Sequence, residues 1–541
     1  MAGTEPTIGV ETRRPWAFLV SLGGRDPAAR GALARDDAPP IDRLQALAPA
    51  LERLGTWRVL DRPEANLPHL AAKARADGYR PIHLALGPVE DVYLTPAVPT
   101  VLFPTWAYPD VPRRDFAADP RPNWGRIARY AAAILAPNDF NARAFERSGL
   151  ACPVGIVPIP IDPAAFDLPD WGPTGSRTFD CRHAMIGGVI DPAGRAVPAS
   201  PSVEGRYRRS WRRATLRAGR GVYLRVSPYL KHPTRSRIER HGAALLRACG
   251  RSPESWDHSA GAKPSAARLA SAVARFGFNK VVRRWLSAEA VGRIGSLKRR
   301  FTRSNSEPTG PEPAASSLTL GGLVFACRLD PIDPRSNLDD LLSAFVAAFR
   351  DRADATLVVE LASPPDMAFH HAHHIRHKLA ALGPEPACRV VVIAGGCPLD
   401  FLSAATFVVT ACHAEATAAF IRRGMAAGRP AIAPTHSGLD GLVDESNGFV
   451  VGSSPEPTSF PGDLERRAET TWGRLSWSDL RDRFVEAAEV AGHPNRYARL
   501  ATAARERMIP LADPDRTVAA LACELGRIGE DKPAAVGWAT D

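Results

Sequence analysis

Residues 406–454 read TFVVTACHAEATAAFIRRGMAAGRPAIAPTHSGLDGLVDESNGFVVGSS, and this stretch decides the fold prediction. An apolar strand is predicted to end at Cys412, and a short turn then places Glu415 at the carboxyl end of that strand. A helix, a turn at 428–430, a short strand, a glycine-containing loop and the strand 447–451 follow. Short apolar strands that alternate with helices predict a parallel, doubly wound sheet.

The same alternation occurs twice along the chain. The first unit has predicted strands at 16–22, 57–60, 82–86, 100–103, 133–136 and 154–161. The second has predicted strands at 322–329, 356–361, 389–394, 407–412, 431–433 and 449–451. Ser336 is predicted to N-cap the helix after the first of these, because serine oxygens accept hydrogen bonds from the first backbone amides of a helix. Both units are typical of Rossmann-like domains, in which ligands bind outside the carboxyl ends of the strands.

The chain divides into four predicted segments. Residues 1–171 form a Rossmann-like domain, and residues 172–316 form a basic, mostly helical insertion whose ends are rich in Gly, Pro and Ser. Residues 317–470 form a second Rossmann-like domain, and residues 471–541 form terminal helices that pack back on both domains. The predicted fold class is therefore α/β, with two Rossmann-like domains facing a cleft and a basic insertion between them.

Charge is concentrated in one segment. The 541 residues include 69 Lys and Arg and 58 Asp and Glu, which gives a formal net charge of +11. Residues 201–310 carry 25 Lys and Arg against 6 Asp and Glu, a balance of +19, so the remainder carries −8. With 45% hydrophobic and 23% charged residues, the composition is typical of a soluble globular protein.

Several classes of protein are excluded by pattern. No apolar run approaches the roughly 18 residues that a membrane-spanning helix needs. The first residues do not resemble a secretory signal, and none of the eight scattered cysteines forms a C-x-x-C pair. We therefore expect a cytoplasmic protein with reduced thiols.

Several motifs point to one family. Residues 425–431 (MAAGRPA) and 447–451 (NGFVV) resemble the helix end and strand that close the second domain of group-1 glycosyltransferases with the GT-B fold. Residues 335–349 and 159–166 are similar to two further motifs of that family. Residues 453–461 with 477–480 are similar to the tail of its bacterial surface-polysaccharide members. The resemblance covers both Rossmann-like units and the terminal helices, but not the insertion.

The resemblance implies a function. Such an enzyme moves a sugar from a nucleotide-sugar donor to a glycan or lipid-linked glycan acceptor, with residues 1–171 on the acceptor side and 317–470 binding the donor. It implies no cofactor and no metal. Cationic side chains neutralise a leaving diphosphate, and carboxylates accept hydrogen bonds from hydroxyls. The candidate residues are Glu415 and Asp110 for catalysis, Arg328, Arg335, Ser336, Glu415 and Arg423 for the donor, and Trp106 and Tyr108 for the acceptor.

The chain departs from the family pattern at two of these positions. Arg423 stands where the family has its second glutamate, and Ser336 stands where it has a phosphate-binding lysine. An arginine cannot accept a hydrogen bond from a ribose hydroxyl. Two hypotheses remain open: an enzyme that holds its donor differently, or a catalytically degenerate scaffold that binds a glycan or a partner enzyme.

The basic segment 201–310 has three interpretations. Lys280, Arg283 and Arg284 beside Trp285 favour an anionic membrane surface, which would place the protein at the inner face of the plasma membrane. Arginines around Trp211 also fit a nucleic-acid-binding surface, but no recognised module is present, so nucleic acid is the weaker expectation. The third is a solvated insertion that packs on its own domain.

Five histidines at 370–377 favour adventitious metal binding over a functional site.

Overall fold

The computed structural model describes residues 14–23, 39–116, 120–181, 183–186, 316–362, 368–393, 399–461, 463 and 465–528. The expectations for the basic segment 201–310 lie outside the described residues. No helix within the described residues is long and apolar enough to cross a membrane.

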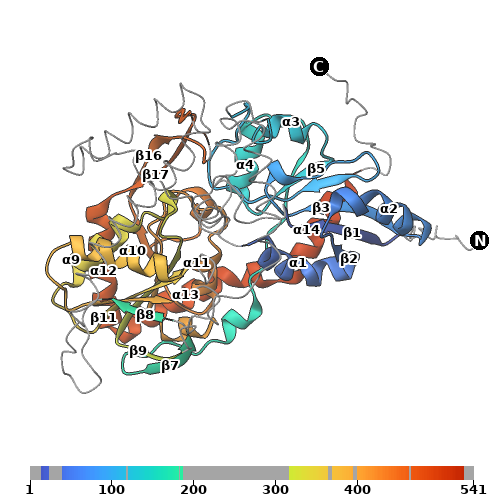
Figure 1. Cartoon of the computed structure of the whole chain (residues 1–541). Helices are drawn as coiled ribbons and strands as arrows, with labels where there is room; N and C mark the ends of the chain where they lie inside the picture. Colours follow the sequence, from blue (N-terminus) through green and yellow to red (C-terminus); the bar gives the residue numbers. More distant parts are fainter. Residues whose placement is uncertain are drawn as a thin grey trace, which may run out of the picture. The chain divides into compact units, whose positions relative to one another are not determined.

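The first domain is built on a sheet of six parallel strands (Figure 1). The strands are β1 (Trp16–Ser21), β2 (Gly55–Val59), β3 (Arg80–Ala85), β4 (Thr100–Leu102), β5 (Ala133–Ala136) and β6 (Val154–Ile156). Their order is β2-β1-β3-β4-β5-β6. The central strands are almost wholly buried, which explains their near-continuous apolar sequences.

The second domain has a seven-stranded sheet in the order β15-β14-β13-β10-β11-β12-β8. The strands are β10 (Leu323–Leu329), β11 (Ala355–Leu361), β12 (Arg389–Ile393), β13 (Phe407–Val409), β14 (Ala431–Pro434), β15 (Gly448–Val451) and β8 (His183–Ile186). All pairs are parallel except β12 with the edge strand β8. The predicted fold class of two Rossmann-like α/β domains is confirmed.

Helices cover both sheets (Figure 1). Those of the first domain are α1 (Pro40–Leu54), α2 (Pro63–Ala76), α3 (Trp124–Ala128) and α4 (Asp139–Arg147). The later helices are α9 (Leu338–Phe349), α10 (Ala368–Ala381), α11 (Ala419–Ala426), α12 (Trp477–Ala491), α13 (Pro494–Ala512) and α14 (Pro514–Gly526). The Tyr497 hydroxyl on α13 donates to the carbonyl of Thr406 at 2.9 Å, whereas Leu521 and Leu525 on α14 join the core of the first domain.

Strand pairing crosses two of the predicted boundaries. Strands β7 (Ser176–Cys181) and β9 (Ser316–Gly321) pair with each other, and β8 joins the second sheet, so the first residues assigned to the insertion belong with the second domain. The hairpin of β16 (Ser453–Thr458) and β17 (Thr470–Leu475) spans the predicted boundary at residue 470.

The prediction that Ser336 caps α9 is wrong. Ser336 lies in the short 3-10 helix η5 (Pro334–Ser336), and Asn337 occupies the N-cap position with a left-handed φ of 47°. The Asn337 side-chain amide donates to Asp340 at 3.1 Å. Asparagine tolerates this backbone conformation better than most residues, which explains why the helix starts one residue later.

Candidate functional site

The strand order of the second sheet reverses next to β10. From β10 the chain proceeds to β11 and β12 on one side, and then crosses to β13, β14 and β15 on the other. Ligands of open parallel sheets bind where the strand order reverses in this way, outside the carboxyl ends of the strands. Arg328 lies near the end of β10, and the loop with Glu415 follows β13, so two predicted site residues flank the reversal point.

The loops at this edge are held in unusual backbone conformations. Asn337 after β10, Ala418 after β13 and Ser437 after β14 have φ values of 47°, 53° and 55°. A non-glycine residue in this region costs on the order of 1 kcal/mol, and such strain gathers at functional sites. A side chain at Gly438 would meet the carbonyl oxygen of Ala416 at 2.3 Å, so the loops after β13 and β14 require glycine there.

Glu415 is fixed by its backbone at this edge. Its amide donates to Ser437 Oγ at 3.0 Å, and its carbonyl accepts from the Gly438 amide at 2.7 Å. Its partly buried carboxylate lies 3.5 Å from Cys412 Sγ. Since α11 begins at Ala419, Glu415 does not occupy the N-cap position of that helix. The backbone bonds hold the residue in place while its side chain remains partly accessible.

Two charged side chains are neighbours at the ends of β10 and β11, and Arg423 of α11 lies within electrostatic reach of one of them. Arg328 and Glu360 are direct partners in the parallel register, and Glu360 is 6% exposed. Burial raises the pKa of Glu360, while the charges of Arg328 and Arg423 lower that pKa. Arg328 Nε is buried and has no hydrogen-bond partner in the described part of the chain. Within the described residues, none of the three side chains forms a hydrogen bond or an ion pair.

Sequence reasoning missed Glu360. The residue stands in the strand sequence ATLVVEL, which is buried throughout. An acidic residue inside a buried apolar strand was the available signal, because carboxylates are rarely buried without a partner. Its neighbours come from a different strand and a helix, so the cluster emerges from register and packing.

Arg335 is already paired. Its guanidinium lies 2.8 Å from an Asp333 carboxylate oxygen, and both side chains are nearly buried, at 12% and 11% exposure. The Arg335 carbonyl accepts from the His413 amide at 2.7 Å, which joins the loops after β10 and β13. Ser336 follows in η5. Arg335 therefore has an ion-pair partner, whereas the side chains of Arg328 and Arg423 have none among the described residues.

The predicted acceptor residues lie in an aromatic cluster. Trp106 and Tyr108 are 4% and 3% exposed, and both pack near Phe460 from the second domain, with ring centroids 6.0 and 6.2 Å away. The Trp106 indole N–H donates to the carbonyl of Asp110 at 2.7 Å. Burial raises the pKa of the Tyr108 hydroxyl, which also lies within electrostatic reach of Arg335.

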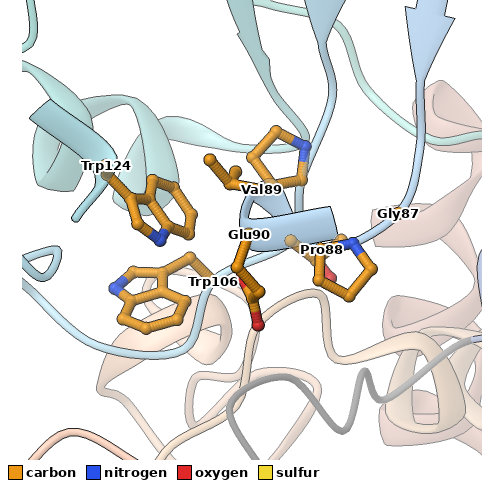
Figure 2. Close-up of a pocket in the computed structure, with 8 residues that line it drawn as sticks. Gly87, Pro88, Val89, Glu90, Trp106 and Trp124 are labelled. Atoms are coloured by element: carbon orange, nitrogen blue, oxygen red, sulfur yellow. The ribbon is translucent and has the colours of Figure 1, made fainter. Parts of the chain in front are cut away.

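One edge of this cluster lines a small pocket (Figure 2). The rings of Trp106 and Trp124 lie next to each other, with centroids 4.9 Å apart, and Glu90 projects beside Trp106. The lining residues are Gly87, Pro88, Val89, Glu90, Pro104, Thr105, Trp106 and Trp124. The pocket therefore joins the loops after β3 and β4 of the first sheet.

Polar side chains near the edge of the first sheet are bonded internally. Arg43 on α1 is 2% exposed and donates to the carbonyls of Leu86 and Phe103, which directly follow β3 and β4. His83 is fully buried, with Nε2 2.9 Å from Ser21 Oγ and Nδ1 3.1 Å from Thr100 Oγ1. Burial lowers the pKa of His83 to about 4.

Contacts between the domains join the carboxyl edges of the two sheets. Asn138 and Asn141 each donate a side-chain amide to the carbonyl of Ala416, at 2.9 and 3.1 Å. Arg114 pairs with Asp463 and with Glu469, the latter at 2.8 Å. The loops that carry Glu415 and the predicted acceptor residues are therefore brought together.

The structure gives no support for a metal centre in its described part. The histidine-rich segment forms α10, and burial lowers the pKa of His374. Within the described residues, no group of three His, Cys, Asp or Glu side chains is placed to hold a metal ion.

Comparisons with known proteins find likeness in structure alone. No family model and no curated protein matches the chain. Three solved structures show distant structural similarity to the chain. The Anabaena protein HepE in complex with UDP and glucose is 12% identical, with a TM-score of 0.43 over 95% of this chain and 100% of that one. A glycosyltransferase from Rickettsia africae is 8% identical, with a TM-score of 0.45 over 95% and 98%. Sucrose-phosphate synthase from Thermosynechococcus elongatus is 12% identical, with a TM-score of 0.43 over 95% and 99%.

Proposed function

We propose that this chain is a glycosyltransferase that moves a sugar from a nucleotide-sugar donor to a glycan or lipid-linked glycan in surface-polysaccharide synthesis. The observation that carries the proposal is a set of charged side chains at the reversal point of the second sheet. Within the described residues, the side chains of Arg328 and Arg423 form no ion pair, Glu360 is the register partner of Arg328, and Glu415 offers a second carboxylate after β13. A nucleotide sugar needs both kinds of group, because it carries a diphosphate and several hydroxyls.

Each residue has a chemical role in this proposal. The arginines bind the diphosphate and stabilise the negative charge that develops as it leaves, an electrostatic contribution that a water-poor site strengthens. Glu415 accepts hydrogen bonds from hydroxyls of the transferred sugar. Asp110, whose carboxylate lies 3.5 Å from the Thr470 hydroxyl beside the domain contact, takes the proton of the acceptor hydroxyl.

The acceptor side belongs to the first domain. Trp106 lines the pocket in Figure 2, where an indole face suits the apolar face of a sugar ring. Tyr108 is also buried, within electrostatic reach of Arg335, and contributes by packing under the acceptor side. The basic segment 201–310 docks the enzyme on the anionic inner face of the plasma membrane, where a lipid-linked acceptor is available.

The proposal is tested by nucleotide binding and by turnover. A ligand that binds the folded chain raises its melting temperature by mass action, so a screen of nucleoside diphosphates and sugar nucleotides should show a concentration-dependent rise. Release of nucleoside diphosphate from the best sugar nucleotide measures turnover. Glu415→Gln should reduce that release strongly, whereas Glu445→Gln at an exposed position should not. If no nucleotide shifts the melting temperature, the proposal is wrong.

One observation favours a second function, a catalytically degenerate scaffold. Arg335, a predicted diphosphate ligand, is occupied by Asp333, and the predicted acceptor residues are buried. A scaffold would bind a glycan or partner enzyme and release no nucleoside diphosphate. In that case Glu415→Gln would change neither the melting temperature measured with each nucleotide nor the binding of the glycan.

A further inference from the structure

Glu360 shares one face of the second sheet with Arg328 and with α11. Side chains two residues apart on a strand point to the same face, so Glu360 lies on the side of Val358. Val358 and Ala326 belong to one core cluster that also contains Ile421 and Met425 of α11. Arg328, two residues after Ala326, therefore faces the same helix, and Arg423 belongs to that helix. Glu360 and Arg328 extend this apolar cluster at the carboxyl edge, and the charge of Arg423 acts on Glu360 from α11.

Within the described residues, the side chains of this charge cluster lack hydrogen-bond partners. A buried carboxylate normally forms hydrogen bonds, because losing water without replacing it is costly. Glu360 forms none within the described residues, and its arginine neighbours lie beyond ion-pair distance. The other charged group that acts on it, Asp42 at the start of α1, is also acidic. The site therefore has acceptor capacity on Glu360 and donor capacity on both arginines.

A nucleoside diphosphate matches both capacities. Its ribose presents two neighbouring hydroxyls, which are hydrogen-bond donors to a carboxylate, and its phosphates accept charge-assisted bonds from guanidinium groups. We propose that Glu360 binds the ribose hydroxyls of the donor nucleotide while Arg423 and Arg328 bind its diphosphate. This proposal rests on the proposed function. The carboxylate that accepts hydrogen bonds from the ribose would then come from strand β11, whereas α11 carries Arg423 at the position of the family's second glutamate.

The test compares nucleotides that differ only in their hydroxyls. The full-length chain is titrated calorimetrically with ADP, GDP, CDP and UDP, and then with the 2′,3′-dideoxy form of the tightest binder. The wild type should bind the ribonucleotide about tenfold more tightly, the value expected for hydrogen bonds to a charged group. Glu360→Gln should weaken ribonucleotide binding about tenfold and leave dideoxynucleotide binding unchanged. The matched control Glu385→Gln, at an exposed position in the same domain, should behave as wild type.

The outcomes separate this inference from the proposed function. If the wild type binds no nucleoside diphosphate, both are wrong. If it binds both forms equally, or if Glu360→Gln keeps the preference for ribose, only this inference is wrong. Should Glu360→Gln fail to fold, Glu360→Asp retains the charge but shortens its reach, and it should still lose most of the ribose preference. If Glu360 were only an internal counter-ion for the arginines, Glu360→Gln would change the affinity for both nucleotide forms alike.

Discussion

The carboxyl edges of the two sheets differ in how their polar groups are satisfied. Near the edge of the first sheet, Arg43 donates to two carbonyls that follow the strands, and His83 lies between two hydroxyl groups. At the edge of the second sheet, the side chains of Arg328, Glu360 and Arg423 form no hydrogen bond or ion pair within the described residues. Internal bonding favours a rigid scaffold, whereas unpaired charges leave capacity for a ligand.

Replacing Arg43 should have the largest effect of the changes considered. Arg43→Met should destabilise the protein by about 3 kcal/mol, because two buried carbonyls lose their charged donor. Nucleotide binding by the folded fraction should change less than about twofold, since the residue belongs to the first edge. Guanidinium denaturation measures the stability, and Arg58→Met, exposed on β2, is the control. A large loss of affinity without loss of stability would contradict the comparison.

Acid should destabilise the first edge through His83. Its pKa falls from 6.5 to about 4 on folding, so the unfolded chain binds the proton more readily below pH 6.5. Stability contributed by the neutral ring is present above pH 6.5 and is lost as pH falls towards 4. Between pH 7 and pH 5 the loss should be about 2 kcal/mol. Denaturation at several pH values should show a shallower dependence in His83→Gln; parallel curves would refute the assignment. Burial also lowers the pKa of His436, and this contribution to the pH dependence is the same in the wild type and in His83→Gln.

Removing a cation from the second edge should affect binding more than stability. Arg423→Ala should weaken binding of the best nucleoside diphosphate about tenfold, or about 1.4 kcal/mol, because a charge-assisted phosphate contact is lost. The melting temperature without ligand should stay close to that of wild type. Calorimetric titration measures the affinity, with Arg499→Ala on the exposed surface of α13 as control. Equal affinity in both variants would place the diphosphate elsewhere.

The contact between the edges should contribute least. Arg114 pairs with Asp463, Glu465 and Glu469. Arg114→Ala should lower the free energy of unfolding of the protein by about 1 kcal/mol at low salt, and by less at high salt. Arg143→Ala is the matched control, because its pair with Asp440 also joins the domains but is half exposed on both sides. A difference between the variants that persists at high salt would exclude an electrostatic origin.

Sequence patterns predicted the buried strands. They did not predict elements whose conformation depends on residues elsewhere in the chain or on a special backbone conformation. Strands such as β5 were predictable because their apolar runs are buried on both faces. The hairpin strand β16, SSPEPT, is largely exposed and forms only because β17 pairs with it. Ser336 was a plausible cap by composition, but a left-handed Asn337 occupies the position.

The candidate site was predictable to the same extent. Arg328 and Glu415 follow strands of a recognisable pattern, so their common edge could be predicted. Glu360 could not be assigned without the register that pairs it with Arg328. Trp106 and Tyr108 were expected to contact an acceptor, but Phe460, more than 350 positions later in the sequence, packs against both. Only the tertiary structure reveals that contact.

A crystal structure of the full-length chain with the best-binding nucleoside diphosphate tests the central claim most directly. The account predicts the diphosphate within hydrogen-bond distance of Arg328 and Arg423, with the ribose hydroxyls on Glu360. Nucleotide bound instead at the edge of the first sheet, in the pocket lined by Gly87 and Trp106, with no contact to Arg328, Arg423 or Glu360, would contradict it.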